Sequence, residues 1–401
     1  MNRLAKLELS RPVELTCFAL CVAQSVYLLA SLLQGHWIFA ADGQLIATDF
    51  VNVWAAGRQA LDGVASSAYD VSVHKGAEVA ALGHPFAGEY PWIYPPSFFL
   101  VAGPLALLPF VVAYAAWMAL SFPAYLATIR AIIGDRLGLL LACSYPGILS
   151  NLLVGQNGFA TAALIGGSLI LLERRPLLAG CCIGLLSFKP HLGILLPLVL
   201  IAGGHWRAMI SAASVGALLF LASAFVFGLD SWYAFLHSLP VASQSALAQG
   251  RADWARLQSA FGLIRVLGSS AALGWTVHCM LGAAVAMLLW KVWRSSIEFD
   301  LKAAALATAI LLVTPYLFLY DLVVLAVAIA FLMRAGRSGG FLRGEMIGLG
   351  LACFLILLFP LVTAPVGFAA ILVVALLIGR RVLVALALPG RSRMPVAAAS
   401  A

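Results

Sequence analysis

Long apolar runs separated by short polar breaks fill nearly the whole chain. The runs lie at 13–33, 97–133, 137–153, 158–172, 176–188, 192–204, 208–228, 270–290, 302–314, 321–333, 345–362 and 366–379. Because a helix needs about 20 apolar residues to cross a bilayer, this pattern predicts an all-α polytopic membrane protein with about 12–13 transmembrane helices. The piece 97–110 contains two prolines, and we expect it to be re-entrant or to cross half of the membrane.

The composition excludes a water-soluble protein. Hydrophobic residues make up 63% of the 401 residues and charged residues 10%, with a mean hydropathy of +1.02, whereas soluble domains have about 25% charged residues. The net charge of +8 comes from basic residues scattered singly or in pairs between apolar runs. Such scatter is typical of helix-end anchors, so nucleic acid is excluded as a partner. The seven cysteines all lie in apolar stretches and are interpreted as small hydrophobic residues.

The distribution of basic residues predicts the topology. Basic residues near the N-terminus (Arg3, Lys6 and Arg11) and at Arg380 and Arg381 place both termini in the cytoplasm. Two longer polar loops, 34–91 and 229–268, then face the outside. We expect residues 1–380 to form a single membrane domain in the plasma (inner) membrane, and 381–401 to be a cytoplasmic tail that is partly disordered. The cytoplasmic connectors are too short for a nucleotide-binding domain, so any chemistry is expected outside.

The stretch 48–63 predicts an amphipathic helix in the first outside loop. Phe50, Val53, Trp54 and Leu61 recur at helical spacing and are expected to lie on the membrane surface. Asp49 stands at the first turn of this helix. It has two interpretations: an acid that caps the helix and favours its dipole, or a general base that accepts the proton of an acceptor hydroxyl.

Three further breaks carry side chains suited to binding a sugar or an acceptor. The aromatic, proline-rich entry at 90–100, the GQNG turn at 155–158 and the TPYLFLYD break at 314–321 are also explained by interface aromatics and turn residues. Turn chemistry does not account for the glutamine, however, and amides and tyrosines are good partners of sugar hydroxyls. The candidates are Tyr94, Gln156, Asn157, Tyr320 and Asp321.

Basic residues at two of the breaks are candidates for binding a phosphate. Lys189 and His191 interrupt two apolar segments with no acidic neighbour in sequence. Lys189 either extends to the membrane interface or, as an ionisable residue at membrane depth, binds a lipid-borne phosphate. In the loop 229–268, Arg251 and Arg256 stand among aromatic residues and either clamp a phosphate or rest on lipid headgroups.

Taken in order, these breaks resemble glycosyltransferase family 87, a family of GT-C-type membrane enzymes that includes polyprenol-phosphate-mannose-dependent mannosyltransferases. The resemblance spans about residues 13 to 335 and lies in the order and spacing of motifs that are each weak alone. These motifs are Asp49-Phe50 with Gly63 and Tyr69-Asp70, the YPP to PLALLP stretch (94–109), GQN (155–157), Lys189-Pro190 and Tyr320-Asp321.

The resemblance implies a GT-C fold and a catalytic base in the first outside loop, a role that falls on Asp49. It also implies a polyprenyl-phosphate sugar donor, inversion at the anomeric carbon and no nucleotide. No cofactor is expected, and no metal, because no carboxylates cluster around Asp49 in the sequence.

These features together predict a membrane hexosyltransferase acting at the extracytoplasmic face. It would move a hexose, with mannose as the expected sugar, to a lipid or glycan acceptor. Two alternatives stay open. A transporter or flippase of lipid-linked sugars would have polar residues through both halves of the membrane. A ligase or polymerase of lipid-linked glycans would need no carboxylate at the start of the first loop.

Overall fold

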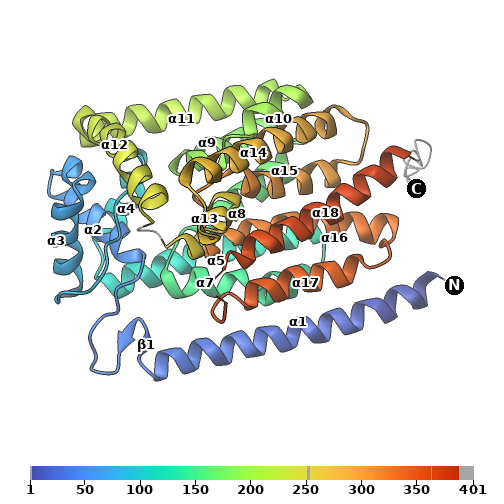
Figure 1. Ribbon diagram of the computed structural model, residues 1–401, viewed down its shortest axis with the longest axis horizontal. Helices are drawn as coiled ribbons and strands as arrows, with labels where there is room; N and C mark the ends of the chain where they lie inside the picture. Colours follow the sequence, from blue (N-terminus) through green and yellow to red (C-terminus); the bar gives the residue numbers. More distant parts are fainter. Residues whose placement is uncertain (1, 251–252, 363, 388–401) are drawn as a thin grey trace, which may run out of the picture.

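The computed structural model describes residues 2–250, 253–362 and 364–387 and consists almost entirely of helices (Figure 1). The α-helices are α1 (Asn2–Leu33), α2 (Phe50–Leu61), α3 (Val71–Leu82), α4 (Phe99–Ala106), α5 (Phe110–Ile133), α6 (Arg136–Ser144), α7 (Gly147–Val154), α8 (Gly158–Leu171), α9 (Pro176–Leu185), α10 (Leu196–Gly203), α11 (Trp206–Phe227), α12 (Leu229–Ser243), α13 (Ala260–Val266), α14 (Ala271–Arg294), α15 (Phe299–Val313), α16 (Val323–Gly339), α17 (Glu345–Leu357) and α18 (Val366–Ala387).

Short elements join these helices. They are the 3₁₀ turns η1 (Ala65–Tyr69), η2 (Pro96–Phe98), η3 (Leu186–Phe188), η4 (Pro190–Leu192), η6 (Trp254–Arg256) and η7 (Leu319–Leu322), the π turn η5 (Gln244–Ala248), and the two-residue antiparallel strands β1 (His36–Trp37) and β2 (Phe39–Ala40). Most of the predicted tail, 388–401, lies outside the described residues.

Six helices among the described residues are long and apolar enough to cross a membrane. They are Arg11–Leu33, Phe110–Ile133, Trp206–Phe227, Ala271–Arg294, Leu319–Gly339 and Val366–Ala387. The pair α6 and α7, bent by 64°, gives a seventh if it is counted as one span. Five shorter apolar helices of 10–17 residues account for other runs, among them Pro96–Ala106 in the piece expected to be re-entrant. Full-length spans are therefore fewer than the 12–13 predicted, because several of the apolar runs, such as 158–172 and 176–188, form helices that are shorter than a full span.

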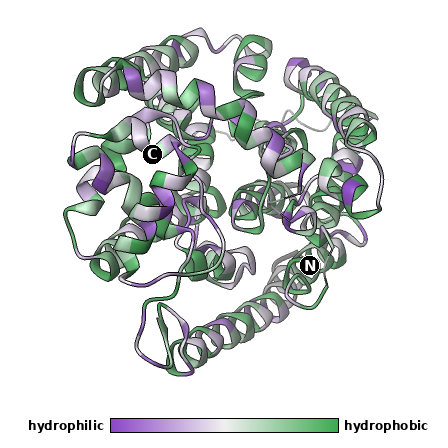
Figure 2. Ribbon diagram, turned by 60° about the vertical axis from the view of Figure 1, so that its left-hand side comes forward, coloured by the Kyte–Doolittle hydropathy of each residue, from purple (hydrophilic) through white to green (hydrophobic). Residues whose placement is uncertain are grey.

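Helix α16 occupies the centre of the bundle. Its residues are apolar all round and buried from Val323 to Ala328, as expected of a helix with protein on every side. It contacts α15, α5, α8 and α18. By contrast, only Ala208 and Ser223 of α11 are buried, so this helix lies at the periphery of the bundle. The outer helices are coloured as hydrophobic along most of their length in Figure 2.

Small residues allow α9 and α11 to pack closely. A Cβ atom added at Gly180 would lie 2.4 Å from the carbonyl oxygen of Ala208, and one at Gly184 would lie 2.6 Å from Cβ of Val215. Two glycines four residues apart thus form the kind of small-residue interface by which helices associate in membranes. The pair α9 and α11 is held by backbone proximity rather than by large side chains.

The described chain ends and the polar loops lie at opposite ends of the molecule (Figure 1). The end with the termini carries three arginine–acid pairs, Arg334–Asp300, Arg337–Asp135 and Arg381–Glu345. The other end carries α2, α3 and α12, which lie in the two loops identified from the sequence. The polar breaks at the start of α2 and at 155–158 therefore share one end of the bundle.

The helix expected at 48–63 forms as α2, but it does not lie on the membrane surface. Phe50 and Val53, which were assigned to the membrane-facing side, are 0% and 3% exposed. The short helix α4 covers α2 so closely that a Cβ at Gly57 would lie 2.1 Å from the carbonyl oxygen of Ala102. Because α3 and η1 also pack on it, α2 is a buried element that fixes the position of its first residue. The surface prediction was wrong for Phe50 and Val53, since a sequence pattern does not show what covers the helix; Leu61, at the end of α2, is 44% exposed.

Candidate functional site

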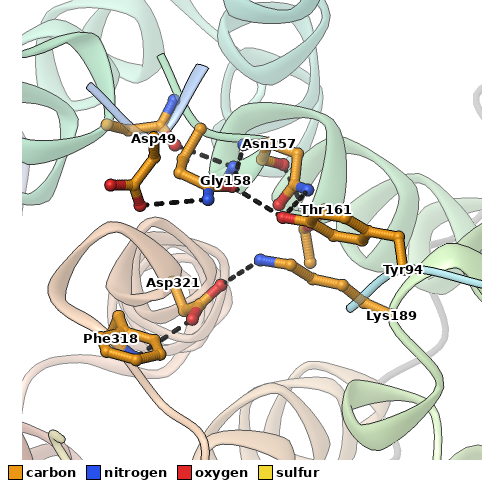
Figure 3. Close-up of polar contacts among 10 residues, drawn as sticks. Asp49, Tyr94, Asn157, Gly158, Thr161, Lys189, Phe318 and Asp321 are labelled. Atoms are coloured by element: carbon orange, nitrogen blue, oxygen red, sulfur yellow. Dashed lines mark hydrogen bonds and ion pairs between the residues drawn. The ribbon is translucent and has the colours of Figure 1, made fainter. Parts of the chain in front are cut away.

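Five segments that are distant in sequence meet at the loop end of the bundle (Figure 3). The start of α2, the turn before η2, the α7–α8 turn, the η3–η4 junction and η7 each contribute polar side chains. Lys189 and Asp321 point toward one another, and Asp49 lies beside them (Figure 3). The structure thus brings together polar groups that the sequence analysis identified at separate breaks.

Asp49 occupies the N-cap position of α2 without capping it. Its backbone is already helical (φ −56°, ψ −23°), and its side chain makes no cap hydrogen bond. Instead, its Oδ2 accepts a hydrogen bond from Nε2 of Gln156 at 3.1 Å. The capping interpretation therefore does not describe what this carboxylate does; it faces the polar cluster.

The surroundings of Asp49 shift its acidity toward neutral pH. Burial raises the pKa of the carboxyl from its ordinary value to about 6, and the nearby Asp321 adds to the increase. The hydrogen bond from Gln156 and the cations Arg256 and Lys189 lower the pKa by less. Asp49 as a whole residue is half-buried. Asp49 is therefore ionised at neutral pH, yet basic enough to accept a proton during a reaction.

A chain of hydrogen bonds fixes the group that contacts Asp49. The hydroxyl of Tyr94 donates to Oε1 of Gln156 at 3.0 Å and accepts from Nδ2 of Asn157 at 2.9 Å. All three side chains are buried. The carbonyl of Tyr94 in turn accepts from the hydroxyl of Tyr69 at 2.8 Å. In the described part of the chain, Oδ1 of Asn157 is a buried acceptor without a hydrogen-bond partner.

The two glycines of the GQNG turn are required by close packing. Gly155 has a φ of +71°, and a Cβ there would lie 2.7 Å from Cβ of Phe50. At Gly158 a Cβ would lie 2.3 Å from the carbonyl oxygen of Tyr320, and its N–H donates to Oδ1 of Asn151 at 2.8 Å. The turn is therefore pressed between the start of α2 and η7, which places its two amides beside both.

Lys189 and Asp321 form a buried ion pair. The distance from Nζ to Oδ1 is 2.5 Å, and the two side chains are 4% and 2% exposed. The other oxygen of Asp321 accepts from the backbone N–H of Phe318 at 3.1 Å. Nζ of Lys189 also lies 5.1 Å from the ring centre of Tyr320, within the range of a cation–π interaction. Lys189 does not extend to the membrane interface; it is held inside the protein.

The other candidates lie around this core. His191 is half-buried and close enough to Lys189 and Asp321 to interact electrostatically with both. The side chain of Arg256 is 71% exposed, with a weak ion pair to Asp253 at 3.7 Å, yet it lies within electrostatic range of Asp49. Arg251 falls outside the described residues.

The comparison with protein families bears directly on this arrangement. The model of glycosyltransferase family 87 matches residues 92–315, more than half of the chain. The chain belongs to glycosyltransferase family 87. Comparison with curated proteins and with solved structures gives no match. The family expected from the order of motifs is thereby confirmed, as is an all-α polytopic membrane fold of the GT-C type.

The family match covers part of the candidate site of this glycosyltransferase. Tyr94, Gln156, Asn157, Lys189 and Arg256 lie within the matched residues. The two carboxylates of the cluster lie outside the match and join it only through the fold. Across the residues that the structure describes, no group of three or more His, Cys, Asp or Glu is placed to hold a metal ion.

Some supporting residues of the glycosyltransferase were not identified from the sequence. Asn151 anchors the GQNG turn, and the hydroxyl of Tyr145 donates to the carbonyl of Leu322 at 2.7 Å, which fixes η7 behind Asp321. Each is a polar group inside an apolar run, and that interruption was the available signal. What neither the runs nor the motifs reveal is which distant segment such a group contacts.

Proposed function

We propose that this family 87 glycosyltransferase moves a hexose from a polyprenyl-phosphate donor to a hydroxyl of a lipid or glycan acceptor, with Asp49 as general base. Mannose is the first sugar to test. The observation that carries the proposal is the position of Asp49: a carboxylate that caps nothing, has a pKa of about 6, and lies beside a buried lysine. A general base works best when its pKa lies near the operating pH.

In the proposed reaction, the acceptor oxygen attacks the anomeric carbon of the donor sugar. The bond from that carbon to the phosphate oxygen breaks, and its electron pair leaves with the polyprenyl phosphate. The proton of the acceptor hydroxyl passes to the Asp49 carboxylate, and attack from the face opposite the phosphate inverts the anomeric carbon. The hydroxyl becomes acidic only as the new bond forms, so a positioned carboxylate is strong enough.

The leaving phosphate needs positive charge, and Lys189 is the proposed source. Its pairing with Asp321 explains how an ammonium can be kept buried in this protein without a ligand. A phosphate oxygen that approaches Nζ would share this ammonium through charge-assisted hydrogen bonds. His191 and the two loop arginines, Arg251 and Arg256, are the further candidates for the same phosphate.

The hydrogen-bonding groups around Asp49 are proposed to hold the sugar or the acceptor. Asn157 offers an acceptor oxygen that has no partner within the described residues. Tyr94, Gln156 and Tyr320 are its neighbours in the cluster, and Asp321 offers carboxylate oxygens beside Lys189. Fixed amides and hydroxyls of this kind orient polyhydroxylated ligands without large rearrangement.

The proposed location of the reaction follows from the charges. The arginine–acid pairs gather at the end with the termini, and the candidate site lies at the other. If basic residues mark the cytoplasmic side, the termini are cytoplasmic and the site faces the outside of the plasma membrane. A lipid-linked donor suits that location because nucleotide sugars are not supplied there.

The test is sugar transfer by the purified full-length protein, assayed with a panel of polyprenyl-phosphate sugars and a separate donor-binding measurement. Asp49→Asn is compared with Asp62→Asn, a matched control at the far end of the same helix whose side chain is 57% exposed. The proposal expects Asp49→Asn to lose transfer while binding the donor, and Asp62→Asn to retain both. Undiminished transfer by Asp49→Asn would refute the base assignment. Lipid that crosses the bilayer without sugar transfer would favour a flippase, and transfer of whole preassembled glycans would favour a ligase or polymerase.

A further inference from the structure

A hollow lies between α5 and α6, far from the candidate site. It is an open pocket of about 470 Å³, and its lining includes Pro123, Ala127, Arg130 and Ala131 of α5 and Leu139 of α6. The α5 residues recur three to four positions apart and therefore share one face of the helix. That face is exposed, so the pocket opens sideways from a membrane-spanning helix toward lipid.

The pocket lies at the end of the molecule that carries the termini. The carbonyls of Ile132 and Ile133, at the end of α5, accept hydrogen bonds from Arg334 and Arg337 at the end of α16, 3.3 Å in each case. Arg130 stands in the last turn of α5. The pocket thus begins where a spanning helix reaches the membrane interface and continues along that helix toward the bilayer.

Unlike the three paired arginines at this end of the molecule, Arg130 and Arg136 have no side-chain partner among the described residues. Arg334, Arg337 and Arg381 are each paired with an acid. In the part of the chain that the structure describes, the side chain of Arg130 makes no ion pair or hydrogen bond, and the nearby Asp135 is paired with Arg337. The guanidinium is therefore an uncompensated positive charge at the rim of the pocket.

The remaining lining is entirely apolar, with Pro, Leu, Ala and Gly side chains only. A free anion would gain nothing from these walls, whereas an acyl chain would bury apolar surface against them. An arginine can bind a phosphate oxygen with two parallel hydrogen bonds, and basic pockets between membrane helices bind anionic headgroups. Charge and shape together select a ligand with a phosphate at one end and hydrocarbon at the other.

We propose that this pocket binds one anionic phospholipid, with its headgroup phosphate on Arg130 and an acyl chain along the exposed face of α5. The proposal requires only that the protein resides in a membrane, so it stands or falls independently of the proposed glycosyl transfer. The alternative is that Arg130 is a general interface anchor that attracts any anionic surface without a defined site.

The experiment measures lipid binding by native mass spectrometry of the full-length protein in detergent. Phosphatidylglycerol, phosphatidylcholine with the same chains, and glycerol 3-phosphate are titrated. Arg130→Gln is compared with Arg136→Gln, which removes the same charge at the same end but does not line the pocket. Ala131→Leu places a larger side chain in the lining of the pocket and keeps Arg130.

The proposal expects bound phosphatidylglycerol, weakened about tenfold or more by Arg130→Gln, the loss typical of a hydrogen bond to a charged group. Arg136→Gln should change binding by less than about twofold, because an exposed charge contributes little on its own. Ala131→Leu should weaken binding although the charge is intact. Equal losses in both arginine variants, equal binding of phosphatidylcholine, or unchanged binding by Ala131→Leu would each overturn the proposal. Glycerol 3-phosphate binding as tightly as the lipid would also overturn it.

Discussion

Replacing Gln156 by methionine should move the pH dependence of sugar transfer to higher pH. The amide of Gln156 donates to the Asp49 carboxylate at 3.1 Å and is the first of the contacts that lower its pKa. Methionine keeps a similar length but cannot donate. Without the hydrogen bond the charged form of Asp49 is less stable, so its pKa must rise above about 6.

The size of the shift follows from the energy of the lost interaction. A hydrogen bond to a charged group contributes about 1.5–3 kcal/mol, and water entering the space returns part of it. We therefore expect about 1.4 kcal/mol, which is about one pKa unit. With a pKa near 7 instead of 6, the ionised fraction of Asp49 at pH 6 falls about fivefold. At pH 8 it decreases by only about one tenth of its value.

The assay is kcat/KM for transfer between pH 5 and 8.5, which reports the ionisations of the free enzyme. Gln59→Met is the matched control, because Gln59 is also buried but bonds His74 and Ser67 at 2.7 and 2.9 Å, away from Asp49. Its acid limb should stay near pH 6. If Gln156→Met lowers the rate equally at every pH and leaves the limb in place, Gln156 only positions groups and the base assignment loses its support.

Three further substitutions test other parts of the arrangement. Lys189→Met should destabilise the protein by about 3–5 kcal/mol because it leaves Asp321 buried and unpaired. Adding Asp321→Leu should restore the unfolding temperature without restoring transfer; a double variant no more stable than the single one would contradict the pairing. Gly155→Ala should abolish transfer because its new Cβ clashes with neighbouring side chains. The control Gly204→Ala has the same φ of +71° but open space around it, so it should lower the free energy of unfolding by about 1–2 kcal/mol and retain transfer. Equal effects of the two variants would show that backbone strain, and not the clash, causes the loss. Asp49→Asn should raise the unfolding temperature at pH 8: the folded pKa lies above the unfolded value, so ionisation above about pH 6 destabilises the fold. This gain should shrink toward pH 5, and a gain that is constant with pH would contradict the raised pKa.

Local pattern was enough to predict the class of fold but not the length of its helices. The apolar runs correctly indicated a helical membrane protein, since a continuous apolar run in a membrane satisfies its own backbone hydrogen bonds as a helix. They overcounted full spans because several runs are shorter than the roughly 20 residues that a helix needs to cross a bilayer. Helix α2 was found in the right place, but two of the residues expected to face the membrane, Phe50 and Val53, are buried inside the protein. Hydrophobic spacing shows that a face is covered, not whether lipid or protein covers it.

In the candidate site too, the sequence predicted which residues are candidates but not which distant residues they contact. Each polar break was visible because it interrupts an apolar run, and the family match supports the overall assignment. The pairings were not visible: Lys189 and Asp321 are 132 positions apart, and Gln156 and Asp49 are 107 apart. Lys189 has no acid nearby in sequence, so its partner could not be predicted. The partner, Asp321, is known only because the fold brings the η3–η4 junction next to η7.

The buried pair also bears on how the proposed base works. Lys189 and Asp321 cancel each other, so Asp49 is the unpaired charge inside the cluster, with Arg256 as a more distant cation. A donor phosphate that shares Lys189 brings a new negative charge and loosens the hold of Lys189 on Asp321. Both changes disfavour the ionised form of Asp49 and so make the carboxylate a stronger base while the donor is in place. The pair would thus serve two needs at once: it keeps an ammonium buried before the donor arrives, and it links donor binding to the basicity of Asp49 afterwards.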